Sequence, residues 1–566
     1  MAITTAQSPF RIDPVSGLRI DRTASTIIKT NAVLSVVFLL VGGFAGLLVA
    51  LTRWPSVHLL NPEMFYMALT AHGIVALMVW IIFFEMAVIY FCATSLLNCR
   101  LATPRWAWVQ VALMLGGAAM TAVAILQGDS SVMMTSYVPM DAAPHFYLGL
   151  ILFAVGALIG CFVFWGTLVI AKEEKTYEGS LPLIVYGAMV AVIIAIFTIA
   201  SGAIILIPTF LWSVGLISSI DPMMYRVIWW AFGHSSQQIN VVTHISIWYL
   251  IASLLFGAKP MSEKVSRGAF LLYILFLQFG SVHHLLADPG LSVAWKIFNT
   301  SYMMYAAVLA SLIHGLTVPG SIEVAQRRNG LNKGLFEWLR KAPWGNPIFS
   351  GMFLSLVIFG FIGGITGVVM SVEQVNMIIH NTFYVPGHFH GTVAGGTTLA
   401  FMALTYYLIP VLFQREVIMQ GIAKLQPYIF GIGISIFAVA TMGAGTLGVP
   451  RRHWDMGFAG QALAYEWPGM AYMLMAVGEM GAVMSVVGGA AFCVIVVGSI
   501  LFGKKIPEDA KPYPRVPDAD LGGHKDIGKG GFEAPGTFIL AMVLFVSLVL
   551  YYFINFKYLS TVWTMS

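Results

Sequence analysis

The chain has 566 residues, of which 58% are hydrophobic and only 10% are charged. Soluble proteins carry about 25% charged residues, so this composition excludes a soluble globular protein. The net charge of +5 is small and lies in the predicted loops, so it does not indicate binding to nucleic acid. Four cysteines occur without a CxxC pair, so neither an iron–sulfur cluster nor a thiolate copper site is encoded here.

Long apolar runs predict an all-α, polytopic membrane protein with thirteen transmembrane helices. The predicted spans cover residues 28–52, 64–95, 106–127, 144–171, 182–212, 223–256, 268–286, 292–318, 347–370, 386–413, 425–446, 470–502 and 534–556. We treat residues 1–566 as a single domain, with residues 503–533 as its longest polar loop. We expect no cleavable signal peptide, because the first 26 residues are polar and lead directly into an apolar run.

The predicted loops differ strongly in positive charge. When the loops are assigned alternately to the two sides of the membrane, 24 of the 30 Lys and Arg residues fall on the side of the N-terminus. The remaining six are Arg53, Arg226, Lys296, Arg451, Arg452 and Lys557. Because cytoplasmic loops carry the excess of Lys and Arg, this split predicts a cytoplasmic N-terminus and makes 503–533 a cytoplasmic loop. A miscount by one helix would destroy the asymmetry, so it also supports thirteen spans.

Six histidines lie inside the predicted spans and, by the orientation above, at a similar depth in the outer half of the membrane. They are His72, His234, His283, His284, His388 and His390. An ionisable side chain in hydrocarbon is costly, so its default interpretation is functional. The alternative is that they are core histidines bonded to backbone carbonyls. Six grouped histidines favour a buried site for several metals, since imidazole is the commonest metal ligand.

The spacing of these histidines predicts their geometry. Two residues that are two apart on an α-helix point about 200° apart, so His388 and His390 would face opposite sides of one helix, as a helix between two haems requires. His283 and His284 would lie about 100° apart and could converge on one ion. His234, on the preceding span, would complete a three-histidine site that suits copper, zinc or iron.

At these residues the chain resembles subunit I of the haem–copper oxidase superfamily, and the resemblance runs through essentially the whole chain. The motifs that carry it are TAHG around His72, WWAFGH ending at His234, VHHLLADPG, HNTFYVPGHFH, and PRR at Arg451–Arg452. Among the branches of the family, the chain is most similar to the B-type, which includes the ba3-type oxidases. The resemblance implies three cofactors: a low-spin haem, a high-spin haem and a copper ion.

The resemblance also implies roles for particular residues. His72 and His390 would be the axial ligands of the low-spin haem iron, and His388 the ligand of the high-spin haem iron. His234, His283 and His284 would hold the copper. Arg451 and Arg452 would pair with haem propionates, with His380 and Asp288 near a propionate of the high-spin haem. Asn376 stands where the B-type pattern has an acid.

The chain departs from the oxidase pattern at the tyrosine that supplies an electron and a proton for O–O cleavage. Gln238, four residues after His234, occupies that position. Another branch supplies the tyrosine from span seven, but Gln278 and Phe279 stand there and Tyr273 is nearly three turns earlier. Coupling two nitric oxide molecules needs only two electrons and two protons. The sequence therefore favours reduction of nitric oxide to nitrous oxide, as in copper-containing nitric oxide reductases related to the B-type branch.

Two alternatives stay open at this point. The chain could be a terminal oxidase that reduces O2 to water with a radical donor elsewhere, or a diheme membrane electron-transfer subunit without gas chemistry. The second alternative leaves the adjacent His283–His284 pair unexplained. Three neutral imidazoles without a nearby acid favour copper over iron at the non-haem site.

The resemblance to the B-type branch implies that a polar track through spans six and eight, on the cytoplasmic side, delivers protons. Its candidates are Tyr249, Ser311, His314 and Thr317, of which Tyr249 matches a family position. Glu85 and Glu479 are intramembrane acids, which are expensive unless they are functional or paired, and Glu85 is a further candidate for the proton path.

The resemblance also implies partners and a location. We expect a subunit II that bears an electron-entry site, such as a binuclear copper centre, and a donor that is cytochrome c-like or a cupredoxin. The expected location is the inner (cytoplasmic) membrane of a bacterium or archaeon, which the protein crosses many times.

Overall fold

The computed structural model of the chain describes all residues except 1–8, 15, 278, 508–532 and 563–566. Nearly all regular structure is helical, with one short antiparallel hairpin near the N-terminus. The elements in chain order are β1 (Phe10–Ile12), β2 (Arg19–Asp21), α1 (Arg22–Arg53), α2 (Pro62–Ile74), η1 (Val75–Val79), α3 (Trp80–Thr94), α4 (Pro104–Leu126), α5 (Pro144–Glu173), α6 (Leu183–Ser213), α7 (Pro222–Phe256), α8 (Glu263–Leu277), η2 (Phe279–His284), α9 (Val293–Phe298), η3 (Asn299–Met303), α10 (Met304–Arg328), α11 (Glu337–Arg340), α12 (Pro347–Ile358), η4 (Phe359–Gly364), α13 (Ile365–Met370), α14 (Glu373–Ile379), α15 (Tyr384–Thr392), η5 (Val393–Thr398), α16 (Leu399–Leu408), η6 (Ile409–Phe413), α17 (Gln420–Thr446), α18 (Gly469–Phe502) and α19 (Pro535–Val562).

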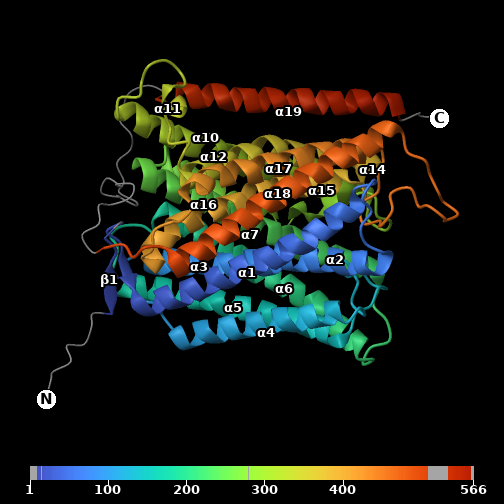
Figure 1. Cartoon of the computed structure of the whole chain (residues 1–566), viewed down its shortest axis with the longest axis horizontal. Helices are drawn as coiled ribbons and strands as arrows, with labels where there is room; N and C mark the ends of the chain where they lie inside the picture. The colour runs from blue at the N-terminus through green and yellow to red at the C-terminus, as the bar shows by residue number, and fades with distance from the viewer. Residues whose placement is uncertain (1–8, 15, 278, 508–532, 563–566) are drawn as a thin grey trace.

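The long helices run side by side along one common direction and form a single bundle (Figure 1). Within the described part of the chain, twelve helical segments are long and apolar enough to cross a membrane. This arrangement confirms the prediction of an all-α, polytopic membrane protein.

The seventh predicted span, residues 268–286, differs from its prediction. It begins as α8 but ends as the 3-10 helix η2, and Gln278 between them lies outside the described residues. The prediction that His283 and His284 lie on an α-helix is therefore wrong. The segment soon meets Asp288–Pro289, and the residue before a proline is disfavoured in the α conformation. A helix that approaches such a stop commonly tightens its last turn to 3-10 geometry.

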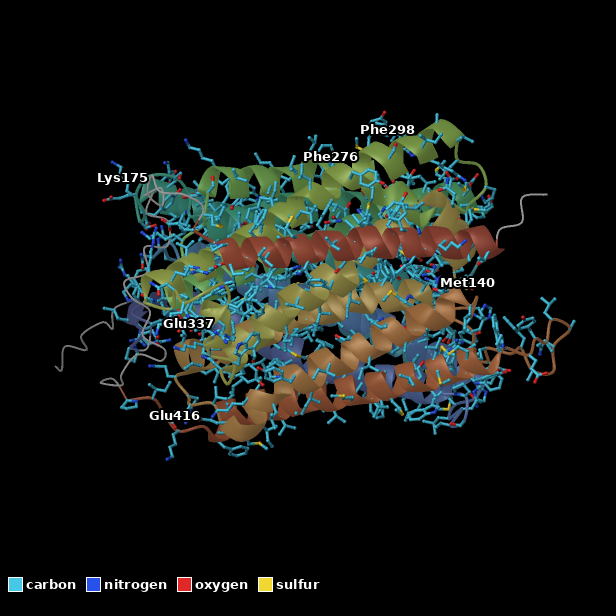
Figure 2. The ribbon with its side chains drawn as sticks, turned by 90° about the horizontal axis from the view of Figure 1, so that it is seen from above. Met140, Lys175, Phe276, Phe298, Glu337 and Glu416 are labelled. Atoms are coloured by element: carbon cyan, nitrogen blue, oxygen red, sulfur yellow. The ribbon has the colours of Figure 1, made fainter. Side chains whose placement is uncertain are left out.

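The helices that carry the histidines are the most buried ones. The most apolar window of the segment Tyr384–Phe413 is 89% buried, and those of Pro222–Phe256 and Pro62–Thr94 are both 83% buried. The corresponding window of α19 is only 6% buried; α19 lies along the top edge of the bundle in Figure 1 and in front of the other helices in Figure 2, which is seen from above. Since histidines on the edge would face lipid, this ranking places the candidate site in the centre.

Small residues bring neighbouring helices close together around this centre. A Cβ atom on Gly433 of α17 would lie 2.6 Å from the backbone nitrogen of Ser485 on α18, and one on Gly481 would lie 2.6 Å from that of Phe437. In membranes, where lipid is as apolar as the side chains, such close backbone approach is a main source of helix association.

Local sequence signals explain how the site-bearing helices begin and where they deviate. Asp221 caps α7 by accepting a hydrogen bond from the backbone of Met224 at 2.8 Å, and Pro222 stands in the first turn, where its missing N–H costs nothing. π-Helical turns follow His72 (η1) and His390 (η5) on their own spans. Such turns are rare and occur often at functional sites.

Charged loop residues gather at one end of the bundle. Figure 2 shows Lys175, Glu337 and Glu416 at the same end, opposite Met140 and Phe298. The loop 503–533 begins at this end, but residues 508–532 of it lie outside the described residues. The cytoplasmic orientation of this end stays a prediction from the loop charges.

Candidate metal centre

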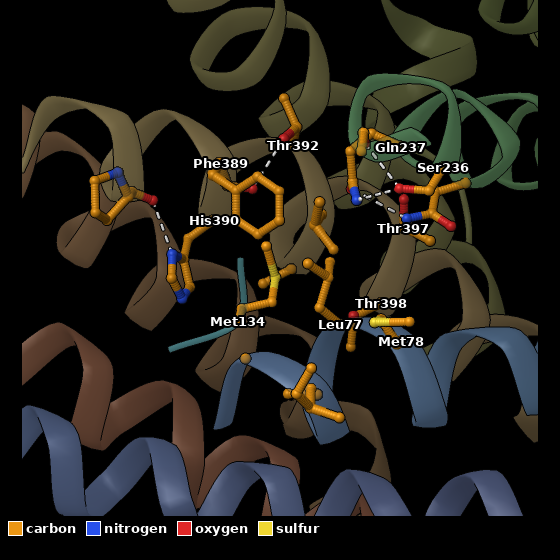
Figure 3. A pocket seen from close by; sticks show the side chains of 18 of the residues that line it. Leu77, Met78, Met134, Ser236, Gln237, Phe389, His390, Thr392, Thr397 and Thr398 are labelled. Atoms are coloured by element: carbon orange, nitrogen blue, oxygen red, sulfur yellow. Dashed lines mark hydrogen bonds between the residues drawn. The ribbon is translucent and has the colours of Figure 1, made fainter. Parts of the chain in front are cut away.

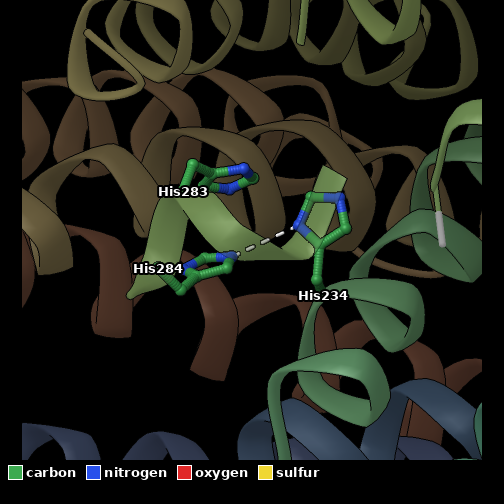
Figure 4. Close-up of side chains that lie close together, drawn as sticks. All are labelled: His234, His283 and His284. Carbon is green, nitrogen blue, oxygen red and sulfur yellow. Dashed lines mark hydrogen bonds between the residues drawn. The ribbon is translucent and has the colours of Figure 1, made fainter. Parts of the chain in front are cut away.

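Three histidines from two elements converge in the centre of the bundle. His234 extends from α7, and His283 and His284 extend from η2 (Figure 4). One ring nitrogen of each lies within 4.8 Å of the others. His234 Nδ1 and His284 Nε2 are 3.2 Å apart, and the rings of His283 and His284 are 4.1 Å apart between centroids. The two histidines therefore converge as expected, although 3-10 rather than α geometry brings them together.

The surroundings hold these rings in place. The ring of His284 lies flat against Trp230, with centroids 3.7 Å apart and planes 10° apart. Asn376 donates to the carbonyl of Met370 at 2.8 Å and approaches the carbonyl of His283 at 3.5 Å, so it supports η2 from the side. The group that converges here contains no carboxylate among the described residues. Three imidazoles without a carboxylate suit copper.

Gln238 lies directly against His234. The two Nε2 atoms are 3.3 Å apart, one turn along α7, while His234 Nδ1 faces His284. If Nδ1 of His234 binds a metal, the neutral ring carries its proton on Nε2. This Nε2–H group must then donate a hydrogen bond to Gln238. Amide oxygen and nitrogen are assigned from the hydrogen-bond network, so metal binding would place Oε1 of Gln238 toward His234 and its NH2 group toward the cavity.

His72 and His390 face each other across a gap. Their rings are nearly parallel, 6° apart, with centroids separated by 6.1 Å. With metal–nitrogen bonds of about 2 Å, two imidazoles on opposite sides of one ion have centroids roughly 6 Å apart. His72 Nδ1 bonds the carbonyl of Gly42 at 2.9 Å and His390 Nδ1 bonds that of Pro386 at 2.8 Å, which leaves both Nε2 atoms free. A backbone acceptor on the other ring nitrogen is the usual support of a metal-binding histidine.

His388 lies on the other side of α15 from His390. Its Nδ1 is 3.0 Å from the hydroxyl of Thr366, and Gly367 leaves space for its ring, because a Cβ there would lie 2.8 Å from His388 Cε1. This agrees with the expected divergence of two residues that are two apart on one helix. Phe389, between them in sequence, lines the same cavity (Figure 3).

One largely apolar cavity of about 760 Å³ connects these groups. Its lining includes all six histidines: His72, His234, His283, His284, His388 and His390. A large apolar cavity with a few convergent polar groups is the usual form of a cofactor site. The free Nε2 atoms, the parallel pair and the single histidine fit two haems and one further metal ion.

A cluster of partly buried arginines lies beside the cavity, and Arg451 and Arg452 line it. Arg226 makes a two-pronged ion pair with Asp288 at 2.7 and 2.9 Å, and Arg451 donates to the amide oxygen of Asn381 at 2.8 Å. Arg452 lies over the ring of Tyr137, 5.7 Å from its centroid. Burial and the neighbouring Arg452 and Arg226 lower the pKa of Arg451 to about 9.

His380 lies at the edge of this cluster, near Asp288. Its Nε2 is 3.9 Å from Asp288, and burial together with the charge of Arg451 lowers its pKa to about 4. Among the described residues, the cluster thus contains one carboxylate, Asp288, and three guanidinium groups, so positive charge is in excess. Carboxylates of a bound cofactor, such as haem propionates, would supply the missing anions.

Tyr249 is the centre of a separate hydrogen-bond cluster. Its hydroxyl lies 3.0 Å from Ser266 Oγ, 3.0 Å from His314 Nδ1 and 2.5 Å from Thr317 Oγ1. Ser311 does not bond this cluster and instead lies 2.7 Å from the hydroxyl of Tyr273. The ring of Tyr273 is parallel to that of His314, 6.0 Å away, so the two pairs are adjacent.

Glu85 lies apart from the Tyr249 cluster. It belongs to α3, is 4% exposed, and lines the cavity beside Asn240 and Thr243 of α7. Within the described part of the chain, no hydrogen bond joins it to Tyr249 or its partners. The structure therefore divides the predicted proton-path residues between two places.

Sequence reasoning missed several residues of this region. Arg226 and Arg53 were counted only as loop charges, yet Arg226 pairs with Asp288 and Arg53 lines the cavity. Tyr273 was judged too far along its helix, yet it lines the cavity with Ser311. An arginine at the start of a span, opposite an acid at the end of the next, was the one available signal for the Arg226–Asp288 pair.

The fold and this cavity define a polytopic membrane protein built to hold metal-containing redox cofactors. Residues 26–484 match the family "Cytochrome C and Quinol oxidase polypeptide I", and the chain belongs to that family. It is 31% identical to cytochrome c oxidase subunit 1 of Thermus thermophilus over 437 residues, which cover 74% of this chain and 76% of that protein. It is 25% identical over 337 residues to cytochrome c oxidase polypeptide 1 of Halobacterium salinarum, covering 56% and 52% of the two chains.

A solved structure supports the same conclusion. The chain superposes on one chain of a heme-copper terminal oxidase dimer determined by cryo-EM, with a TM-score of 0.82 and 26% identity, covering 94% of this chain and 93% of that one. The protein is thus a catalytic subunit I of the haem–copper oxidase type, and members of its family carry a low-spin haem, a high-spin haem and copper. Subunit I works in the membrane together with a subunit II.

Proposed function

We propose that the chain reduces nitric oxide to nitrous oxide at a high-spin haem–copper centre. The observation that supports this most directly is Gln238, whose amide lies 3.3 Å from His234 where an oxidase has its tyrosine. An amide cannot give up an electron and a proton as a phenol does. Nitric oxide coupling does not need that extra equivalent, since it consumes two electrons and two protons.

In this proposal the histidines divide among three metals. His72 and His390 bind the low-spin haem iron, His388 the high-spin haem iron, and His234, His283 and His284 the copper. When bound, the high-spin haem and the copper supply the electrons and the open coordination positions for the gas. The parallel rings of His72 and His390 and the absence of a carboxylate from the three-histidine group support this division.

The protein's own residues orient and neutralise what is bound. Arg451 and Arg452 hold haem propionates, with His380 and Asp288 beside them, and Arg226 fixes Asp288. The NH2 group of Gln238 points to the cavity and donates a hydrogen bond to an N–O oxygen that gains negative charge. Tyr249, His314 and Thr317 pass protons toward Tyr273 and Ser311, which line the cavity.

The proposal extends to the setting of the chain. Thirteen spans, with α8 and η2 as the seventh, give a cytoplasmic N-terminus in the inner membrane of a bacterium or archaeon. Electrons arrive from a subunit II with an electron-entry site such as a binuclear copper centre, fed by a cytochrome c-like protein or a cupredoxin. The four cysteines of this chain are buried and unpaired, so no thiolate site of its own competes for that role.

Reduction of O2 to water is the second candidate function. It is favoured by Tyr273, whose hydroxyl bonds Ser311 at the cavity and whose phenol has the chemistry that Gln238 lacks. A purely electron-transferring diheme subunit would need only four histidines and would leave the three-histidine group without a purpose.

Replacement of Gln238 by methionine tests the proposed role, because methionine keeps the shape and loses the amide. The expected result is a loss of NO turnover on the order of 10²-fold, with copper content and low-spin haem spectrum unchanged. Mass spectrometry of the peptide that contains His234 should find no side-chain crosslink. Full NO turnover in the Gln238→Met variant, or a crosslink from His234 to any tyrosine, would contradict the proposal.

A further inference from the structure

Helix α7 presents two polar faces. By 3.6 residues per turn, His234, Gln238 and Tyr249 lie within about 60° of one another. Ser236, Asn240 and Thr243 lie within about 60° on the opposite side. The first face serves the three-histidine group and the Tyr249 cluster, and the second is not used by the proposed reaction.

The second face forms a short polar row along the cavity. Asn240 donates to the side-chain oxygen of Gln237 at 3.2 Å, and Gln237 donates to the hydroxyl of Ser236 at 3.3 Å. Figure 3 shows Ser236 and Gln237 close to Thr397 in the cavity. Ser236 and Thr243 are seven residues apart, so the row extends about 10 Å along the helix.

Glu85 of α3 stands at the inner end of this row. Its Oε1 atom and the hydroxyl of Thr243 are close enough to interact, but neither makes a hydrogen bond of 3.5 Å or less among the described residues. No ion pair neutralises Glu85 in the described part of the chain. A buried carboxyl without a cation is far cheaper when it carries its proton. Two facing groups that both lack partners are a suitable place for a bridging water.

A second set of buried polar side chains continues from Glu85 toward the end of the bundle where α1 and α4 begin. The hydroxyl of Tyr90 donates to Gln110 Oε1 at 3.3 Å, and Gln110 Nε2 donates to Asn31 Oδ1 at 3.0 Å. All three side chains are fully buried, with exposures of 0%. Apolar residues would pack these positions at no desolvation cost, so a buried network of three polar side chains calls for a purpose.

Helix α5 packs against the stretch of α3 between Glu85 and Tyr90. Cys161 of α5 lines the same cavity as Glu85. Its neighbour Gly160 has no side chain, and a Cβ there would lie 3.3 Å from the hydroxyl of Tyr90 and 2.4 Å from the sulfur of Met86. The glycine thus lets α5 approach α3 closely between Glu85 and Tyr90.

We infer that these residues form a second proton-delivery route, from Asn31, Gln110 and Tyr90 through Glu85 to the Thr243–Ser236 row of α7. The Glu85 carboxyl gives its proton to water at Thr243 and becomes a carboxylate, and it takes a proton back from water on the side of Tyr90. Each proton delivered is one of those that the gas reaction consumes. The inference rests on the proposed function only in needing a proton-consuming centre in the cavity.

This route is distinct from the Tyr249 cluster in position and in chemistry. The two lie on opposite faces of α7, and no hydrogen bond between described residues joins them. The Tyr249 cluster contains hydroxyls and an imidazole but no carboxyl. The route through α3 contains Glu85, which among its described residues is the group that can store a proton as an acid beside the cavity row.

The experiment uses the complete purified complex with Glu85→Gln, which keeps the shape and removes the acidic proton. After rapid reaction of the reduced complex with the gas, proton uptake should slow on the order of 10²-fold. Copper content and the low-spin haem spectrum should be unchanged. Glu85→Asp should recover most of the rate, and an infrared carboxyl band that appears in wild-type difference spectra should vanish in Glu85→Gln.

Glu479→Gln is the matched control, because Glu479 is also a buried carboxyl that lines the cavity with an oxygen lacking a partner, but it lies on α18. Its proton uptake should match the wild type. Wild-type uptake in Glu85→Gln, or equal slowing in Glu479→Gln, would overturn the inference. Each variant is compared with the wild type on whichever gas reacts faster, so an error in the choice between NO and O2 leaves this test intact.

Discussion

The two faces of α7 differ in how their polar groups are satisfied. On one face, His234 and Tyr249 both have close polar partners, which belong to the three-histidine group and the Tyr249 cluster. On the opposite face, Thr243 and the facing Glu85 retain polar atoms without partners. The comparison teaches that one helix can fix metal ligands on one side and leave room for water on the other, because its periodicity separates the two.

The largest expected effect comes from removing one ligand of the three-histidine group. His283→Ala should abolish copper binding and gas turnover, because two imidazoles remain where three converge within 4.8 Å. The low-spin haem spectrum should persist, since His72 and His390 belong to other elements. Metal analysis and optical spectra of the purified complex check this. A variant that keeps its copper would show that the three histidines do not form the site.

Removal of the His72 side chain should affect the low-spin haem and leave the copper site intact. With its ring gone, His390 faces an empty position, so His72→Ala should lose the six-coordinate low-spin signal and electron entry to the gas site. Copper content should remain at one per chain, which distinguishes this from general misfolding. Survival of the six-coordinate signal would show that the ligand pair is wrongly assigned.

The Tyr249→Phe variant tests whether the two polar faces of α7 deliver protons by separate routes. The variant removes the hydroxyl that lies near Ser266, His314 and Thr317, so uptake through this cluster should slow on the order of 10²-fold. If the two faces work in parallel, Tyr249→Phe combined with Glu85→Gln should be slower than either variant alone. A double variant no slower than the slower single one would place both residues on one route.

The sequence alone was sufficient to predict the helical bundle and the histidines that converge inside it. Apolar runs of fixed length and the residue spacing of His388 and His390 obey helical geometry, which is local. The 3-10 form of η2 was not predictable in the same way, because it depends on the stop at Asp288–Pro289 and on packing against Trp230 of α7. Arg226 was missed because its partner is 62 residues away and meets it only in the folded bundle.

The proton-path residues show the same limit. Tyr249, His314 and Thr317, which were candidates on the resemblance alone, do come together, but Ser311 pairs with Tyr273 instead. The position of Glu85 relative to α7 depends on how α3 packs, which its own sequence does not encode. Local periodicity gives the face of a helix, and only the tertiary arrangement gives its partner.

The smallest predicted effect tests the support of His72 with a matched pair on α1. Gly46→Ala places a Cβ 2.7 Å from His72 Nδ1, whereas Gly43→Ala meets nothing within 4 Å. Gly46→Ala should displace the ring, shift the low-spin haem spectrum and destabilise the protein by about 1–3 kcal/mol. Gly43→Ala should leave the spectrum unchanged and slightly raise the thermal stability. Identical spectra for the two variants would mean that His72 is not held where its contacts place it.

The central claim is that the amide of Gln238 beside His234 suits the centre to nitric oxide. The most direct test is the turnover of the purified complex with NO and with O2, supplied with the same electron donor. The account predicts that NO is reduced well above O2, with nitrous oxide as the product and no tyrosyl radical during turnover. Sustained four-electron reduction of O2 at a higher rate than NO turnover would contradict it.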